Sequence, residues 1–319
     1  MPKSPSLGIM LPRDMDPRRV LEFARHVDEL GFDELWVVED LGFRGGIAQA
    51  AATLAVTERI RVGVGILPAA VRNVAYTAME AATLAQLFPG RVDFGIGHGM
   101  PGWMRALGVW PDRPLRFLGD QVLSLKALLR GESIASLVDG DDPIVLDPHV
   151  VPAVAPDVVL GVRGPKSLRV SGQVADGTVL AEPCTPEYVR AAIGQIDAAG
   201  PHRVIAYNIA AVAASEGDAI AAARPGLEWI GEPDWSPHIT PLDIAEEFAA
   251  LRARCGSPAE FAARLPDEWV ARLALAGTAA QVRARIDELG DAGVTSAVLI
   301  PVGPDPLAAA EALAEVLHR

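Results

Sequence analysis

The sequence predicts an α/β protein of the (β/α)8 TIM-barrel class, with a helical insertion before the last strand. Short apolar runs alternate with amphipathic helical patterns, which is the order that surrounds a parallel sheet with helices. Many of these runs end in a polar or glycine-rich turn. At 319 residues and 50% hydrophobic composition, the chain can bury such a barrel as a single domain, residues 1–319.

Apolar runs predict the eight strands of this barrel. They are expected at residues 7–11, 34–38, 60–66, 92–96, 157–162, 177–180, 204–213 and 295–300. The second run is apolar after its first residue, as expected of a parallel strand that is buried on both faces.

Apolar residues at helical spacing predict a helix after each strand. The first helix is expected to begin at Asp16-Pro17, an N-cap residue followed by proline, and to end at Gly31. Others are expected at residues 47–56, 74–88, 117–130, 165–175, 186–199, from the Thr278 capping box to residue 289, and after the last strand. Two segments depart from the alternation. They are an Asp- and Pro-rich excursion at about 132–155 and a Pro-interrupted helical insertion at about 214–276, which is placed to roof the active end.

Charge and cysteine content narrow the class of partner. A formal net charge of -13 argues against nucleic acid or an anionic membrane, because both need a clustered basic surface. Cys184 and Cys255 are too few for a disulfide framework, which favours a reducing, cytoplasmic setting. No apolar run approaches the roughly 18 residues of a membrane span. We therefore expect a small-molecule substrate.

The chemistry of such a barrel lies at the carboxyl ends of its strands. The residues expected to meet there are Glu39-Asp40, residues 66–68, Gly97-His98-Gly99, residues 163–166, Glu182 and Pro301. Glu39 and Asp40 are candidates to protonate or tune a bound ring. The alternative is that these acids only face solvent or cap the next helix.

His98 follows an apolar strand and lies between glycines, a turn that lets a planar ligand lie against bare backbone. Its reference pKa of about 6.5 suits hydrogen bonding or proton transfer. The alternative is a packed or capping histidine.

Gly164-Pro165-Lys166 begins a helix directly after a strand, so free N–H groups, the helix dipole, Lys166 and Arg163 together suit a phosphate. The alternative is that this proline only marks a helix start.

Metal catalysis has no local signature in the sequence. The six histidines, which include His318 near the carboxyl terminus, show no His-x-His or His-x-x-x-His spacing. No Gly-x-Ser-x-Gly elbow is present, and Gly95-Ile96-Gly97 lacks the third glycine of the Rossmann fingerprint. We predict no metal site.

An ordered set of segments resembles the bacterial-luciferase-like flavin-dependent oxidoreductases. The segments are Leu35-Trp36-Val37-Val38-Glu39-Asp40, residues 57–65, the Arg72 turn, residues 89–91 leading to Gly95-Ile96-Gly97-His98-Gly99, Gly164-Pro165-Lys166, residues 175–177, and residues 276–278 through 292–294. Each segment alone occurs in many proteins, but their order along nearly the whole chain is specific to this family.

This resemblance implies a barrel that binds coenzyme F420, an 8-hydroxy-5-deazaflavin, or alternatively FMN. Glu39-Asp40 followed by Arg44 is closer to the branch of methylenetetrahydromethanopterin reductase and other deazaflavin enzymes, which favours F420 and hydride transfer with a small organic substrate. The ring would contact Gly97, His98 and Gly99 and a turn at Gly65-Ile66-Leu67, where the family often holds a non-proline cis peptide. The phosphate would lie at Val162, Arg163, Gly164, Pro165 and Lys166. Relatives are often dimers, so a homodimer is possible.

The sequence also departs from this family. Met100-Pro101 stands where the family's sugar-phosphate dehydrogenases place an acid, so their proton donor and substrate class are not expected. Three alternatives stay open at this point. They are an FMN-dependent monooxygenase of the family, a non-catalytic flavin-binding protein, and a metal-dependent barrel hydrolase.

Overall fold

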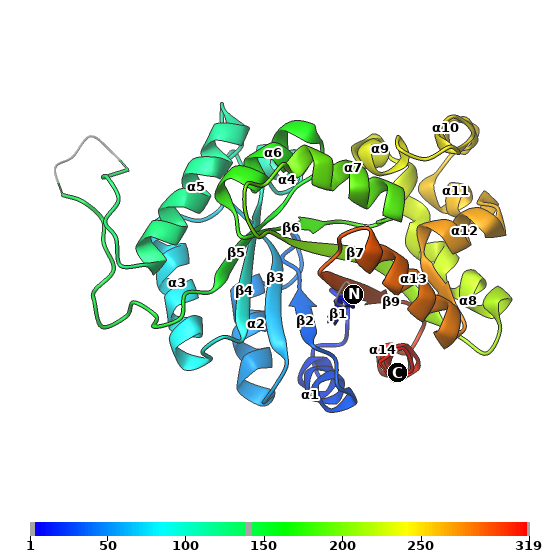
Figure 1. Cartoon of the computed structure of the whole chain (residues 1–319), viewed down its shortest axis with the longest axis horizontal. Helices are drawn as coiled ribbons and strands as arrows, with labels where there is room; N and C mark the ends of the chain where they lie inside the picture. Colours follow the sequence, from blue (N-terminus) through cyan, green and yellow to red (C-terminus); the bar gives the residue numbers. More distant parts are fainter. Residues whose placement is uncertain (1–3, 138–141, 318–319) are drawn as a thin grey trace.

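The computed structural model describes residues 4–137 and 142–317 and has a closed parallel barrel at its centre (Figure 1). The strands are β1 (Ser6–Met10), β2 (Glu34–Val37), β3 (Arg61–Pro68), β4 (Val92–Gly97), β5 (Asp157–Gly161), β6 (Gly177–Leu180), β7 (Arg203–Val212), β8 (Leu275–Gly277) and β9 (Ser296–Pro301). The strands β1 to β7 pair in order, and β9 joins β7 to β1. The predicted (β/α)8 TIM barrel is confirmed.

Helices follow the strands and surround the barrel (Figure 1). They are α1 (Val20–Leu30), α2 (Gly46–Val56), α3 (Val74–Leu87), α4 (Pro101–Ala106), α5 (Pro114–Leu129), α6 (Pro165–Val174), α7 (Pro186–Ile196), α13 (Ala279–Asp291) and α14 (Pro306–Ala314). The insertion between β7 and β8 holds α8 (Glu216–Ala223), α9 (Ser236–Ile239), α10 (Ala245–Ala253), α11 (Pro258–Arg264), α12 (Asp267–Leu273) and the 3-10 helices η1 (Arg224–Gly231) and η2 (Pro233–Trp235). The capping box expected at Thr278 is present at the start of α13.

Three local expectations were wrong or incomplete. The first helix begins at Val20, because Asp16 forms a turn in which its carboxylate accepts the Arg18 N–H and its carbonyl accepts the Arg19 N–H. The short helix α4 was not expected after β4. The strand β8 overlaps the end of the segment expected to be helical, and it pairs with the far end of β7, outside the closed ring.

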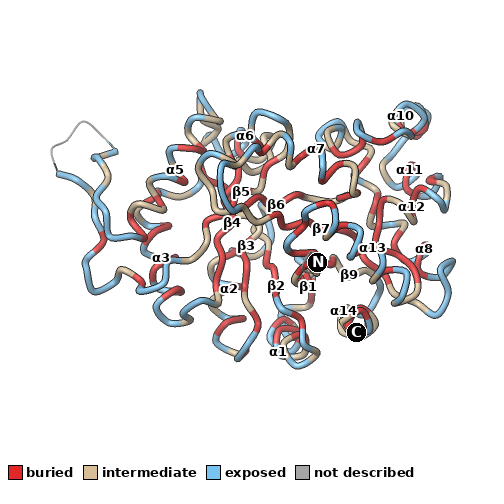
Figure 2. The backbone as a smooth tube through the Cα atoms, in the orientation of Figure 1, coloured by how far each residue is buried: buried red, intermediate tan, exposed pale blue. Residues whose placement is uncertain are grey.

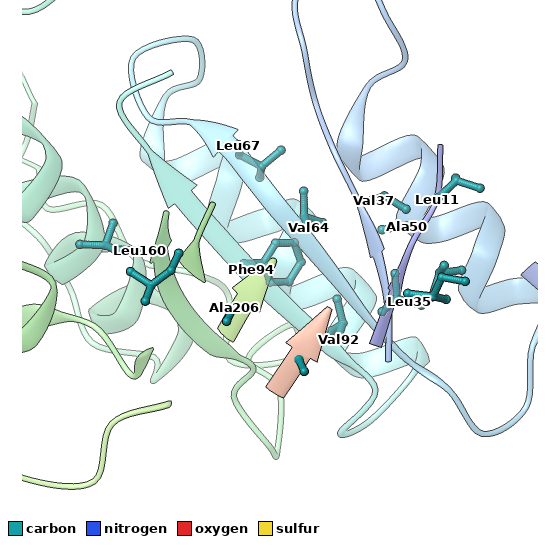
Figure 3. Packing of buried hydrophobic residues seen from close by; sticks show 14 of the residues in the cluster. Leu11, Leu35, Val37, Ala50, Val64, Leu67, Val92, Phe94, Leu160 and Ala206 are labelled. Carbon is teal, nitrogen blue, oxygen red and sulfur yellow. The ribbon is translucent and has the colours of Figure 1, made fainter. Parts of the chain in front are cut away.

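Side chains of the strands fill two separate apolar layers. Leu35 and Val37 of β2 point outward toward the helices, together with Val64 and Phe94 of the neighbouring strands (Figure 3). Trp36 alternates with them and lies inside the barrel, in a second cluster. That cluster comprises Trp36, Val159, Val179, Ile205, Tyr207 and Val298. β2 is therefore buried on both faces, as its apolar sequence predicts.

Glycine on β3 makes room for the large residue inside the barrel. A Cβ atom at Gly63 would lie 2.3 Å from the Trp36 ring, far inside van der Waals contact. The indole can therefore pack across the barrel only because β3 carries no side chain there. Trp36 also meets Tyr207 edge to face, with ring centroids 5.9 Å apart.

The amino-terminal end of the barrel is closed by a cluster of charged side chains. Arg203 donates to Asp93 and Asp157, each at 2.8 Å, and to Glu34 at 3.2 Å. Glu34 also accepts hydrogen bonds from the Trp36 indole at 2.7 Å and the Ser296 hydroxyl at 2.6 Å. This end therefore pairs its buried polar groups with one another.

The excursion at about 132–155 runs outward from the barrel and is largely exposed (Figures 1 and 2). One antiparallel bridge joins Ile134 and Ile144, while residues 138–141 lie outside the described ranges. Across residues 4–137 and 142–317, no helix combines the length and apolar character that crossing a membrane requires.

Candidate active site

The carboxyl ends of β4 and β5 bring the predicted ring and phosphate segments together. Gly97 pairs with Gly161 across the two strands. One residue further on, His98 Nε2 lies 3.4 Å from the Ser167 hydroxyl in the first turn of α6. Burial lowers the pKa of His98, so its imidazole is neutral at neutral pH. The side chain is thus a neutral hydrogen-bonding group beside the start of α6.

The start of α6 has the properties of an anion site. Gly164 precedes the helix with a φ of +80° and supplies no side-chain cap, and Pro165 occupies the first turn. The first N–H groups of a helix have no acceptor within it, and here no side chain covers them. Lys166 is exposed and forms no ion pair with any described residue. This end can accept a phosphate without first breaking an existing ion pair.

A cis peptide bond joins Gly65 and Ile66 at the position that the family resemblance implies. The Ile66 side chain lies over three glycines of the next two strands. A Cβ at Gly161 would lie 2.3 Å from Ile66, and a Cβ at Gly95 or Gly97 would lie 3.1 Å from it. These three glycines therefore make room for Ile66, and the contact of the Gly97 backbone with a planar ligand stays a prediction.

The other predicted site residues on β3, β4 and β5 take different positions. The side chains of Leu67 and Val162 belong to the layer between strands and helices (Figure 3 labels Leu67), so only their backbone can face the mouth. Gly99 has a left-handed φ of +70°, and a Cβ there would meet Met104 and Pro68 at 3.1 Å. Glycine is therefore required at this turn for its conformation.

The two acidic candidates after β2 are both engaged in ion pairs. Glu39 binds both terminal nitrogens of Arg72, and it accepts the Gly46 N–H at the start of α2 at 2.6 Å. Asp40 accepts a hydrogen bond from Arg13 at 2.6 Å. These contacts hold the loops after β1, β2 and β3 together.

The helical insertion contacts the segments that follow β5 and β6. Arg163 donates to the Asp234 carbonyl at 3.2 Å, and its guanidinium lies 4.6 Å from the centre of the Trp235 ring. His238 is fully buried, with Nδ1 3.3 Å from the Pro183 carbonyl. Arg163 was predicted to bind phosphate, and the structure gives it these contacts with the insertion.

Tyr207 of β7 is a polar residue at the site that the sequence reasoning missed. Its hydroxyl is buried and has no hydrogen-bond partner, and a Cβ at Gly65 would lie 2.5 Å from it. Burial raises the pKa of this phenol, so it stays protonated. The available signal was the Tyr207-Asn208 pair within the mostly aliphatic run of β7.

The described part of the chain contains no group of three or more His, Cys, Asp or Glu side chains arranged to hold a metal ion. His318 lies outside the described ranges.

Comparisons with known proteins agree with this fold and show the family of the chain. The model of the luciferase-like monooxygenase family matches residues 3–296, so the chain belongs to that family. It is 27% identical over 303 residues to the 5,10-methylenetetrahydromethanopterin reductase of Methanolobus tindarius, covering 90% of this chain and 91% of the relative. It is 31% identical over 180 residues to the F420-dependent glucose-6-phosphate dehydrogenase of Beutenbergia cavernae, about half of each chain (51% and 52%).

The fold also matches a solved structure along its whole length. The coenzyme F420 dependent tetrahydromethanopterin reductase from Methanopyrus kandleri superposes with a TM-score of 0.79 at 23% identity, covering 99% of both chains. This likeness independently supports the closed barrel with its insertion.

Proposed function

We propose that this chain is an oxidoreductase that binds coenzyme F420 and transfers a hydride between it and a small organic substrate. The observation that carries the proposal is the contact between His98 and Ser167. It joins a hydrogen-bonding group suited to a ring with a helix start suited to an anionic tail. The relatives from Methanolobus tindarius and Beutenbergia cavernae, a reductase and an F420-dependent dehydrogenase, support the same chemistry.

The residues present fit a deazaflavin. The uncapped start of α6, with Lys166 exposed beside it, would hold the phosphate. Ile66, which packs against the Gly97 position, would offer an apolar surface for the ring. His98 would hydrogen-bond the ring edge, and the free Tyr207 hydroxyl below offers a further donor.

Each residue then has a defined task in the reaction. When bound, the deazaflavin supplies the carbon that accepts or releases a hydride. Neutral His98 holds a hydrogen bond at the ring edge. Glu39, through Arg72 and the Gly46 N–H, positions the loops around the mouth, and Asp40 does so through Arg13. The insertion, docked through Arg163, excludes water from the reacting carbon.

The first test is a binding titration of the cofactor-free protein with F420 and with FMN. We expect tighter binding of F420. A clear preference for FMN, with oxygen activation when a reductase is supplied, would instead support the monooxygenase alternative. Binding without any hydride exchange would support the non-catalytic flavin-binding alternative.

The second test concerns the phosphate site. Lys166→Glu places a negative charge beside the start of α6 and should weaken F420 binding by about 10-fold or more, the scale of one charge-assisted hydrogen bond. Arg169→Glu makes the same charge change one turn later in α6, where Arg169 faces Asp197. The control should change affinity by less than about threefold. If Lys166→Glu and Arg169→Glu bind F420 with equal affinity, the start of α6 does not bind the phosphate.

The third test separates binding from turnover at His98. His98→Ala should bind F420 with nearly parental affinity and transfer hydride about 100-fold more slowly. A variant that turns over at the parental rate would remove the role of His98 at the ring. Because burial keeps the imidazole neutral, the parental rate should show no protonation step of His98 near pH 6.5.

The proposal also covers domain organisation, oligomeric state, cellular location and substrate class. We take residues 1–319 as one domain, since the apolar cluster of the insertion includes Ile209 and Ala211 of β7. A homodimer, a cytoplasmic location and a substrate other than a sugar phosphate stay predictions. The last follows from Met100-Pro101, which provide no acid after β4.

A further inference from the structure

Arg105 is an unpaired cation beside the candidate cofactor site. It is exposed in the last turn of α4, the short helix that follows β4. Its guanidinium forms no ion pair and no hydrogen bond with any residue of the ranges 4–137 and 142–317. An unpaired cation can bind an anionic ligand without first breaking an ion pair within the protein.

A tight turn holds the Arg105 guanidinium against an indole ring. Met104 of α4 is buried, which fixes this short helix to the barrel. Gly108 then takes a left-handed φ of +71°, and the Val109 N–H donates to the Met104 carbonyl at 3.0 Å. The chain thereby turns back on itself. As a result, the central carbon of the Arg105 guanidinium lies 5.1 Å from the centre of the Trp110 ring.

A series of contacts links Arg105 to the start of α6. The Trp110 ring lies beside His98, with ring centroids 6.3 Å apart, and His98 Nε2 lies 3.4 Å from the Ser167 hydroxyl. Ser167 and Lys166 both lie in the first turn of α6. Two side chains, those of Trp110 and His98, therefore connect Arg105 to the helix start that suits a phosphate.

The two chain segments on this side of the barrel are cationic, although the whole chain has a formal net charge of -13. Residues 158–175 carry three cations and no acid, and residues 94–119 carry three cations and one acid. Arg163 contacts the insertion, and Arg169 pairs with Asp197. Lys166 and Arg105 form no ion pair with a described residue, so both keep their charge available for an anion.

We propose that Arg105 binds the carboxylates that follow the phosphate in coenzyme F420. The inference rests on the proposed function and extends its cofactor site. F420 carries lactate and glutamate units beyond its phosphate, whereas FMN ends at the phosphate. Stacking on Trp110 covers one face of the guanidinium and leaves its N–H donors at the edge, where a carboxylate can accept two of them. Lys166 would hold the phosphate, and Arg105 would hold the first carboxylates of the tail.

The experiment compares two ligands that share the deazaflavin ring and differ in the tail. The cofactor-free full chain is titrated with F420 and with the same deazaflavin ending at its phosphate. Arg105→Gln should weaken F420 binding about 10-fold, the scale of one charge-assisted hydrogen bond, and change binding of the phosphate-ended ligand by less than about threefold. Arg105→Lys keeps the charge without the bidentate donors and should recover part of the loss.

Two results would overturn the inference. One is an F420 affinity of Arg105→Gln within about threefold of the parent, and the other is an equal loss for both ligands. Arg130→Gln is the matched control, because Arg130 is also exposed but lies at the far end of α5, where it pairs with Glu132. It should bind both ligands like the parent. A loss of F420 affinity as large as that of Arg105→Gln would show that net charge governs binding, which also overturns the inference.

The outcomes separate this inference from the proposed function. If the parent binds neither ligand, the proposed function fails and the role of Arg105 fails with it. If the parent binds both ligands and Arg105→Gln changes neither affinity, only the inference fails. If Lys166→Glu weakens both ligands while Arg105→Gln weakens F420 alone, the phosphate and the tail have separate partners, as the inference requires.

Discussion

The two ends of the barrel treat buried polar groups in opposite ways. At the amino-terminal end, Arg203 pairs with Glu34, Asp93 and Asp157. At the carboxyl end, the Tyr207 hydroxyl is buried without a hydrogen-bond partner, and no cation of the described residues forms an ion pair with Glu182. Both ends place polar atoms against the same apolar interior. We infer that the amino-terminal end stabilises the fold, whereas the carboxyl end keeps hydrogen-bonding groups available for a ligand.

The pKa shifts of Arg203 and Glu182 also distinguish the two ends of the barrel. Burial alone lowers the pKa of Arg203, but the adjacent Asp93 and Glu34 carboxylates outweigh it and raise the pKa above its ordinary value. Arg203 is therefore a permanent cation that balances buried acids. At the mouth, burial raises the pKa of Glu182 without a comparable partner. A charge cluster thus closes one end, while a group able to change its protonation state lies at the other.

The largest expected effect comes from breaking the closed end. Arg203→Met removes the cation shared by three carboxylates and leaves Asp93 and Glu34 buried without it. We expect the free energy of unfolding to fall by about 3–5 kcal/mol, as for other buried pairs that lose one partner. Urea denaturation followed by circular dichroism measures this loss.

The control for this prediction is an exposed ion pair on the outside of the barrel. Arg169→Met removes the partner of Asp197, and both side chains are more than half exposed (58% and 68%). Its effect should stay below about 1 kcal/mol. Similar losses in the two variants would contradict the special role of the amino-terminal cluster.

The next effect is expected at the mouth, where Ile66 fills the space over three glycines. Gly161→Ala places a methyl group 2.3 Å from Ile66, so we expect a loss of about 1–3 kcal/mol from overpacking. Adding Ile66→Ala should recover part of that loss, which a double-mutant cycle in urea measures. Gly194→Ala in α7 meets no neighbouring atom and serves as the control, with stability unchanged or slightly raised. Additive effects of the first two changes would show that Ile66 does not fill this space.

These glycines show where sequence reasoning succeeds and where it fails. Strand and helix periodicity predicted the barrel, because each element carries its own local signal. The glycines near His98 were correctly noticed, but their purpose depends on Ile66, about thirty residues earlier in the chain. A steric demand between distant residues leaves no periodic pattern, so the packing of Ile66 against these glycines could not be predicted from the sequence.

Some contacts at the candidate site could be predicted from the sequence, and others could not. The meeting of His98 with the start of α6 was predicted, since carboxyl ends of barrel strands share one rim. The engagement of Glu39 by Arg72 was not, because nothing local pairs an acid with a cation in the next loop. The contact of Arg163 with the insertion was missed for the same reason. The sequence pattern of each segment predicts its secondary structure and hence the fold. Ion pairs between loops depend on the positions of residues far apart in the sequence, so no local pattern predicts them.

The insertion offers a pH-dependent test of the carboxyl end. Burial lowers the pKa of His238 to about 3, with nearby Arg163 contributing. Above about pH 6.5 neither the folded nor the unfolded chain binds this proton. Below it the unfolded chain does and the folded chain does not, so stability falls as the pH drops toward 3. The loss from His238 should reach about 2 kcal/mol at pH 5.

His238→Phe should remove this slope while keeping an aromatic ring against Tyr188, whose ring centroid is 4.1 Å from the His238 ring. Urea unfolding at pH 7 and pH 5 measures it as the difference between parent and variant. The pKa of His202 is also lowered by burial, but His202 is present in both proteins and cancels. Identical slopes in the two proteins would mean that His238 is protonated in the folded chain.

The smallest effect on stability is expected at Tyr207. This variant tests directly whether the carboxyl end keeps a hydrogen-bonding group for a ligand. Tyr207→Phe keeps the ring against Trp36 and removes a buried hydroxyl that has no partner, so stability should stay the same or rise by up to about 1 kcal/mol. Ser171→Ala provides the contrast. That buried hydroxyl is 2.7 Å from the Thr178 hydroxyl and bonds the Gly177 carbonyl, and its loss should cost about 1–2 kcal/mol. If Tyr207→Phe destabilises the protein as much as Ser171→Ala, the Tyr207 hydroxyl is already satisfied in the free protein. If stability holds while F420 affinity falls, the unpaired hydroxyl at this end of the barrel serves the ligand.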